Sequence, residues 1–190
     1  MIRSQLCAIG DISPSTFNSH RRNGDLPFGG PGANPIVKGG WGRFSLHDAM
    51  FLIAARQLAA TQGVGWGEAA SILRSNPMHV GRGPVFSNYW SNPGHYMARV
   101  SFVDDANGFP PSWICTALEV YAGPLADIVA TATEKAEWAS ERSVAAGYRP
   151  VMTSTFAAVN LSHMWELTLQ RAAALGISPD ATTLETEPDE

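Results

Sequence analysis

The sequence predicts an α+β protein, in which a helical N-terminal part precedes a smaller part that mixes strands and helices. Through the first 75 residues, apolar side chains recur at the spacing of helices, whereas after residue 95 strand-like segments alternate with helical ones. The 190 residues are 45% hydrophobic and 16% charged, a composition that suits a folded core. A wholly disordered chain is therefore excluded.

Two short helices are expected at the N-terminus. The first covers residues 3–9. In the second, Ser13 is a favourable N-cap, and Pro14 falls at the first helical position, where its missing N–H costs nothing. This second helix covers residues 14–23, and Gly24 is expected to end it.

A stretch rich in glycine and proline follows over residues 28–41 and excludes a helix there. Residues 36–37 and 41–44 are expected to form two brief strands. Gly39 and Gly40 between them supply the turn of a hairpin.

Two further helices complete the N-terminal part. Ser45 is the expected N-cap of the first of them. Asp48, three residues later, is its expected partner in an arrangement that resembles a capping box. Apolar residues then recur at helical spacing over residues 46–58. Gly63 interrupts this pattern, and residues 66–74 predict another short helix.

The C-terminal part predicts a small α+β module that ends in a strand-helix-strand-helix order. Strands are expected over residues 95–103, 112–120 and 153–161. Helices are expected over residues 125–146 and 163–175, each followed by a glycine that ends it.

These elements suggest four segments. Residues 1–75 form one domain, and residues 76–94, rich in Gly, Pro, Asn and Ser, form a linker. Residues 95–177 form the α+β module. The polar and acidic residues 178–190 are expected to be a disordered tail.

Charge is distributed unevenly along a chain whose net charge is -4. Residues 1–100 carry nine Lys and Arg against four Asp and Glu, whereas residues 101–190 carry four against thirteen. Such asymmetry points to nucleic acid as a partner of the basic half.

The order helix, tight turn, helix, glycine-rich hairpin and two more helices is that of a winged helix-turn-helix. The stretches "ISPSTFNSHRRNGDLPF" and "GRFSLHDAMFLIAARQLAATQGVGWGEAASILR" resemble the DNA-binding domain of the MerR family. In that family, a second helix opening with Ser-Pro-Ser-Thr ends at a glycine followed by Leu-Pro. The wing then ends before a Ser-capped helix, here as Gly42-Arg43-Phe44-Ser45, and the resemblance covers about residues 1–75.

A winged helix-turn-helix of this kind binds double-stranded DNA. The start of its second helix reads base edges in the major groove, and basic side chains of the helix end and the wing contact bases or phosphates. The expected DNA-binding residues are Ser15, Thr16, Asn18, His20, Arg21 and Arg22 in the helix, with Lys38 and Arg43 in the wing.

The chain also departs from the MerR pattern. Gly42 replaces the usual first arginine of the wing, and Asn18-Ser19 stands where the second helix usually carries Arg-Tyr. No long heptad-bearing helix follows residue 75, so the coiled-coil dimer of that family is not expected. Metal sensing is not expected either, because the cysteines, Cys7 and Cys115, form no cluster.

No motif for catalysis or cofactor binding is found. The glycine-rich stretches match neither a P-loop nor GxGxxG, and neither GxSxG, HExxH nor a pair of carboxylates occurs. We therefore expect no catalytic residue, no metal site and no cofactor.

The start lacks the apolar core of a signal peptide, and the longest apolar run is too short to span a bilayer. A cytoplasmic protein without membrane contact is expected.

The sequence thus predicts a sequence-specific DNA-binding transcriptional regulator, which is not an enzyme. A homodimer is expected to form through residues 95–177, with the helices over residues 125–146 and 163–175 as candidates for the contact. The same module could bind a small-molecule or protein effector. Two alternatives remain open: an excisionase-like architectural factor that bends DNA in recombination, and an enzyme whose site lies in the C-terminal module.

Overall fold

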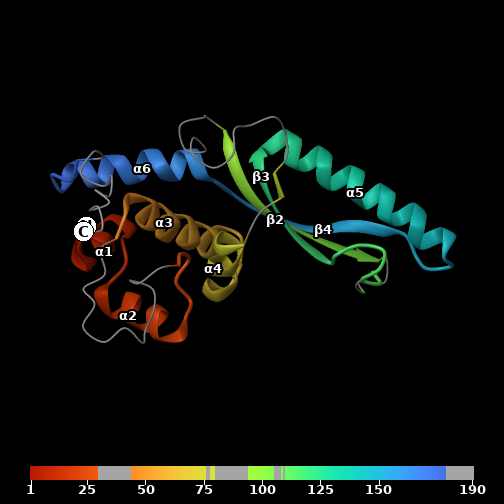
Figure 1. Ribbon diagram of the computed structural model, residues 1–190, viewed down its shortest axis with the longest axis horizontal. Coiled ribbons are helices and arrows are strands. Elements are labelled where there is room, and N and C mark those ends of the chain that lie inside the picture. Colours follow the sequence, from red (N-terminus) through yellow and green to blue (C-terminus); the bar gives the residue numbers. More distant parts are fainter. Residues whose placement is uncertain (30–43, 76–77, 80–93, 105–107, 109, 179–190) are drawn as a thin grey trace, which may run out of the picture. The chain divides into compact units, whose positions relative to one another are not determined.

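The computed structural model describes residues 1–29, 44–75, 78–79, 94–104, 108 and 110–178 (Figure 1). Within these ranges the chain forms six helices and a sheet, which confirms the mixed α+β class. The two expected wing strands, apart from Phe44, lie outside the described residues, as do most of the expected linker and nearly all of the expected tail.

The chain divides into two compact units. The first, the helical unit, contains residues 1–59, 65–74 and those from His163 onward, and the second, the sheet unit, contains residues 60–64 and 75–162. The helical unit holds α1 (Arg3–Gly10), α2 (Pro14–Asn23), α3 (Leu46–Thr61), α4 (Trp66–Arg74) and most of α6 (Leu161–Ala174). The sheet unit holds β1 (Met78–His79), β2 (His95–Asp104), β3 (Leu118–Pro124), α5 (Leu125–Ala145) and β4 (Val151–Asn160).

Capping residues place the helices of the first unit where the sequence predicts them. The Ser13 hydroxyl accepts a hydrogen bond from the backbone N–H of Thr16 at 3.0 Å, and Gly24 ends α2 in the left-handed conformation. At the start of α3, the Ser45 hydroxyl accepts from the Asp48 N–H at 3.1 Å, and the Asp48 carboxylate accepts from the Ser45 N–H at 2.8 Å. Both caps satisfy donors that a helix start leaves unpaired.

A phenylalanine cluster and close helix packing form the core around α1 and α2. Phe17 of α2 is fully buried and meets Phe44 edge-on, with ring centroids 5.7 Å apart. A Cβ at Gly10 would lie only 3.1 Å from side-chain atoms of Leu52, so the glycine lets α1 approach α3 closely.

The helix α6 belongs with the helical unit and not with the sheet, which revises the expected module of residues 95–177. Met164, Thr168 and Ala172, spaced four residues apart along α6, are buried. The Trp165 ring stacks on His47 of α3 with centroids 4.9 Å apart. The apolar stripe of α6 is thus buried within the helical unit, whereas the sequence pattern alone does not identify the partner of an amphipathic helix.

The sheet has the strand order β1-β3-β2-β4. The central strand β2 pairs antiparallel with β3 and β4, and the two-residue β1 pairs parallel with β3. The expected strand over residues 112–120 is only partly correct, because β3 begins at Leu118. The segment before it is a turn, in which the Pro111 carbonyl accepts from the backbone N–H of Ile114 at 2.8 Å.

One face of the sheet is covered by α5 (Figure 1). Ile128, Ala132 and Ala136 of the helix pack against a buried cluster that includes Phe102 of β2 and Tyr121 of β3. Their spacing of four residues defines the inward face of α5. None of the helices in the described ranges is long and apolar enough to cross a membrane.

Candidate nucleic-acid interface

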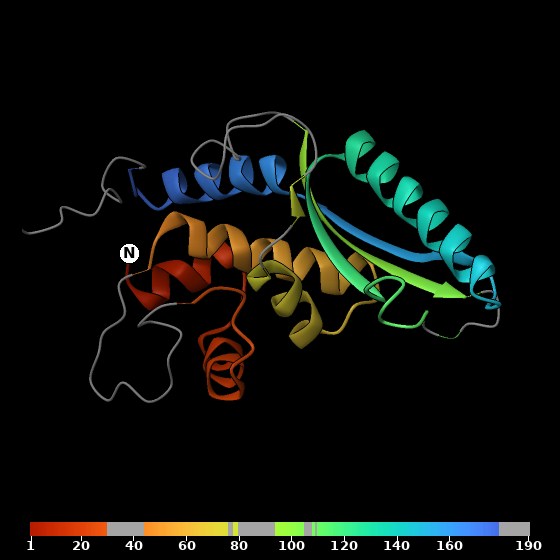
Figure 2. The ribbon, with the colours of Figure 1, turned by 45° about the vertical axis from the view of Figure 1, so that its right-hand side comes forward.

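A turn of three residues joins α1 to α2. Asp11 adopts the left-handed conformation at φ 52°, and the Ile12 N–H donates to the Cys7 carbonyl at 3.0 Å. Aspartate tolerates this conformation better than most residues other than glycine. The turn therefore closes α1 and lets α2 run in a different direction (Figures 1 and 2).

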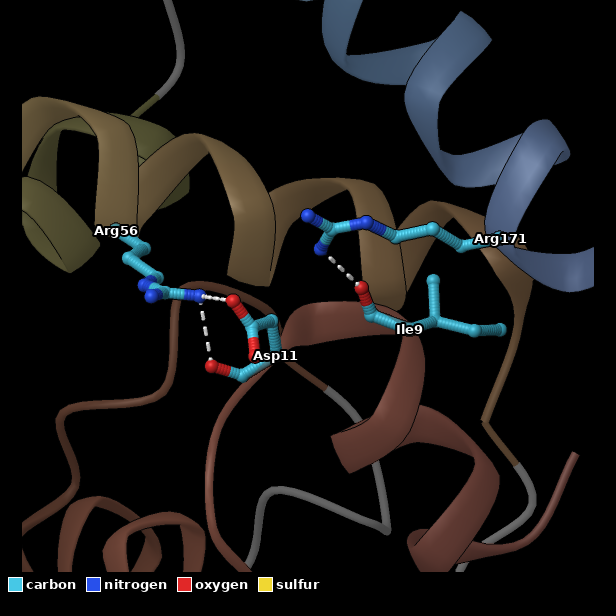
Figure 3. Close-up of polar contacts among 4 residues, drawn as sticks. All are labelled: Ile9, Asp11, Arg56 and Arg171. Carbon is cyan, nitrogen blue, oxygen red and sulfur yellow. Dashed lines mark hydrogen bonds and ion pairs between the residues drawn. The ribbon is translucent and has the colours of Figure 1, made fainter.

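Two arginines from later helices contact this turn and the end of α1 before it (Figure 3). Arg56 of α3 donates to the Asp11 carbonyl at 2.8 Å and forms an ion pair with the Asp11 carboxylate. This hydrogen bond and charge lower the pKa of the Asp11 carboxyl. Arg171 of α6 donates to the Ile9 carbonyl at 2.7 Å, near the end of α1. The angle between α1 and α2 thus depends on segments far away in the sequence.

Hydroxyl groups gather at the start of α2. The Ser13 hydroxyl shares hydrogen bonds of 2.8 Å with the hydroxyls of Ser15 and Thr16. All three residues are exposed. The positive end of the helix dipole lies at the same place, so this end favours negatively charged groups.

The outer face of α2 consists of the exposed residues Ser15, Thr16, Ser19 and Arg22. Phe17 is buried, which fixes the outward direction of this face. Three of these residues are among the expected DNA-binding residues, whereas Ser19 is not. Its position four residues after Ser15 was the available signal, because such residues share one face of a helix.

Asn18 and Arg21, two other expected DNA-binding residues, are half-buried. The side-chain carbonyl of Asn18 accepts a hydrogen bond from Arg3 of α1 at 3.2 Å. A side chain that contacts DNA has to be exposed, and Arg21 is exposed only in part. It precedes Arg22 by one residue and therefore points about 100° away from it around the helix.

His20 packs against α4. Its ring stacks on Trp66, with centroids 4.1 Å apart and an angle of 16° between the planes. Burial lowers the pKa of His20, so the ring is neutral at pH 7. Trp66 in turn donates from its indole nitrogen to the Asp25 carbonyl at 2.8 Å, and Arg74 donates to the Gly24 carbonyl at 2.6 Å. These contacts make His20 part of the support that α4 gives to the end of α2.

The expected wing residues, Lys38 and Arg43, lie outside the described residues. The described portion of the chain contains no group of three His, Cys, Asp or Glu that could hold a metal ion.

A polar cluster of the sheet unit lies between β3 and α5. The buried Glu119 carboxylate accepts a hydrogen bond from the Tyr121 hydroxyl and pairs with Lys135 of α5 at 2.8 Å. Burial raises the pKa of the nearby Cys115 thiol and keeps it protonated. The three charged and polar groups satisfy one another, so their arrangement suits a structural link from α5 to the sheet.

Comparisons with protein-family models, with curated proteins and with solved structures found no match.

Proposed function

We propose that this protein is a sequence-specific DNA-binding transcriptional regulator that inserts α2 into the major groove of double-stranded DNA. The observation that carries the proposal is the short turn between α1 and α2 together with the exposed outer face of α2. Two helices joined by a turn of three or four residues are the usual arrangement in which a second helix enters the groove.

The chemistry of the outer face fits this role. Hydroxyls such as those of Ser15 and Thr16 contact base edges or phosphates, and an arginine such as Arg22 contacts guanine or phosphate. The backbone N–H groups at the start of α2 also suit a phosphate. Asn18, held by Arg3, lies beside this face and retains amide donors for a base.

The charge distribution and the wing also support the proposal. The first hundred residues carry the basic excess, and the acidic residues that follow would be repelled by the phosphate backbone. Lys38 and Arg43 are assigned to phosphate contacts in this proposal, because wing residues contact the backbone beside the groove.

A homodimer completes the proposal. One small DNA-binding domain buries only about 600–1,000 Å² of protein surface on DNA, which is little for specific recognition. Two copies that bind half-sites about one helical turn apart would provide the missing contacts. The sheet unit is the candidate for the contact between copies and for an effector site.

Selection from a pool of randomised DNA duplexes, carried out with the full chain, tests this proposal. We expect an enriched sequence with inverted-repeat symmetry. The variant Ser15→Ala, Thr16→Ala should lose the preference for that sequence while it retains salt-dependent binding to random duplex.

The matched control is Thr133→Ala, which removes an exposed hydroxyl group from α5. This variant should enrich the same sequence as the wild type. Failure of the wild type to enrich any sequence would contradict the proposed function. An unchanged preference in the α2 variant would contradict the role of the outer face.

A further inference from the structure

A groove lies between one flank of α5 and the strand β4. Its volume is about 890 Å³, and its lining includes Glu137, Glu141 and Val144 of α5 and residues 151–153 of β4. Glu137, Glu141 and Val144 recur at three- and four-residue spacing, so they share one flank of the helix. The opposite flank faces β3, where Lys135 pairs with Glu119.

The strand β4 forms an edge of the sheet. In the described ranges it pairs with β2 on one side, and no strand pairs with its other side. An edge strand presents unpaired N–H and C=O groups, and proteins usually guard such edges with charges or proline. None of the residues in Val151–Asn160 is charged or a proline, and residues 152–155 are all exposed.

A bulge interrupts β4 beside the groove. Ser101 of β2 pairs with Thr155 and Phe102 pairs with Thr153, so Ser154 is an extra residue. The Thr155 hydroxyl donates to the Ser101 hydroxyl oxygen at 2.7 Å, which fixes the strand on the far side of the bulge. Bulges redirect side chains and are frequent next to binding sites.

The groove carries negative charge. Glu137 and Glu141 are exposed, and neither forms an ion pair in the portion of the chain that the structure describes. The nearest basic residues of α5 are otherwise engaged, because Lys135 pairs with Glu119 and Arg142 lies 4.8 Å from the centre of the Trp138 ring.

We propose that this groove binds an extended peptide segment of a partner protein, which adds as a strand to β4 and places basic side chains against Glu137 and Glu141. Main-chain hydrogen bonds to an open edge supply affinity in such complexes, and side chains beside the edge select the sequence. Val144 lies on the same flank of α5 and can contact the alkyl stems of these basic side chains.

A second copy of the chain fits this groove less well than a basic peptide. If β4 paired antiparallel with its own copy, both α5 helices would lie on the same face of the joined sheet. The flanks that carry Glu137 and Glu141 would then face each other, and such like charges oppose association.

Two synthetic peptides of eight residues test the proposal on the full chain. One alternates lysine and valine, and the other alternates glutamate and valine. We expect the lysine peptide to shift the backbone amide NMR signals of β4 and of the Glu137–Val144 flank, and to bind more weakly as salt is added. The glutamate peptide should shift none of these signals.

A test variant and a control variant each replace glutamates of α5. Glu137→Gln with Glu141→Gln should weaken binding of the lysine peptide about five-fold, as expected for two exposed ion pairs. Glu134→Gln changes an exposed α5 glutamate that does not line the groove, and it should leave the affinity within about two-fold of the wild type.

Three results would overturn the proposal: no binding of the lysine peptide, equal binding of both peptides, or equal effects of the two sets of variants. Shifts of the same amides on raising the protein concentration alone would instead assign the groove to a second copy. None of these measurements involves DNA, so their failure is distinguishable from a failure of the proposed function.

Discussion

Arg21 and Arg22 carry the same charge and are neighbours in sequence, yet they lie in different environments. Arg22 is exposed on the outer face of α2, whereas Arg21 is half-buried. The sequence predicts that α2 ends in basic residues, and the structure confirms this. The sequence gives no reason to expect different environments for the two arginines. The exposure of each residue follows from the direction in which Phe17 is buried, and that direction depends on packing against residues such as Phe44.

The exposed arginine of α2 gives the sharpest test at this scale. Arg22→Ala should weaken DNA binding and reduce the slope of log affinity against log salt by about 1, because one phosphate contact is lost. Fluorescence anisotropy over a salt series measures this. Arg142→Ala removes an exposed arginine of the sheet unit and should leave the slope unchanged; equal slopes for Arg22→Ala and the wild type would refute the contact.

Two imidazoles that stack on tryptophan rings, His20 and His47, predict how stability depends on pH. Burial lowers the pKa of both His20 and His47 below the usual 6.5. As pH falls below about 7, the unfolded chain takes up protons that the folded chain resists. The free energy of unfolding should therefore decrease from pH 7.5 to pH 5.5, as measured by urea titration.

His47→Gln supplies the control for this pH dependence. The variant removes one titrating ring while keeping a polar side chain of similar size, so the decrease between pH 7.5 and 5.5 should become smaller. A stability that rises on acidification, or a decrease unaffected by the variant, would contradict the role assigned to burial.

At the scale of elements, the helices were predictable where local chemistry defines their ends. Ser13, Gly24 and the pair Ser45 and Asp48 act through neighbours within four residues, and the structure confirms all of them. The segment 112–117 was not predictable as a turn from its apolar residues. Its conformation depends on hydrogen bonds to Pro111, which compete with strand pairing.

The cap of α2 provides a prediction at this scale. Ser13→Ala removes the acceptor for the Thr16 N–H and should lower the free energy of unfolding by about 1 kcal/mol. Ser13→Asp retains an acceptor at the same place and should restore most of the loss. Chemical denaturation of the three proteins measures both effects, and equal stability of Ser13→Ala and the wild type would show that the cap contributes nothing.

At the scale of the whole molecule, the assignment of α6 is the main difference between expectation and structure. Its position after β4 in the sequence suggested that it belongs to the C-terminal module. Its stacking on His47 and the bond from Arg171 to Ile9 instead make it part of the unit that holds α2. Sequence order could not reveal this, because periodicity identifies an apolar face but not the surface against which it packs.

Truncation tests this assignment. A chain ending at residue 160 lacks α6 and should lose stability in the helical unit, seen as faster amide exchange in α1 and α3. A chain ending at residue 178 retains α6 and should exchange as the full chain does. Unchanged exchange of α1 and α3 in the shorter chain would contradict the placement of α6.

Assembly is the second prediction at this scale. If the protein binds an inverted repeat as proposed, light scattering of the full chain should give the mass of a dimer at micromolar concentration. A monomer in the absence and presence of a selected duplex would contradict the dimeric arrangement, although it would leave the contact between α2 and DNA untouched.

Methylation interference on a selected duplex tests the central claim most directly, because it distinguishes the two grooves at single bases. If α2 enters the major groove, methyl groups on guanine N7 should block binding at the positions that the outer face reads. This interference should be lost at one or two positions in the variant Ser15→Ala, Thr16→Ala. Interference only at adenine N3, which lies in the minor groove, or no interference at any base, would contradict the account.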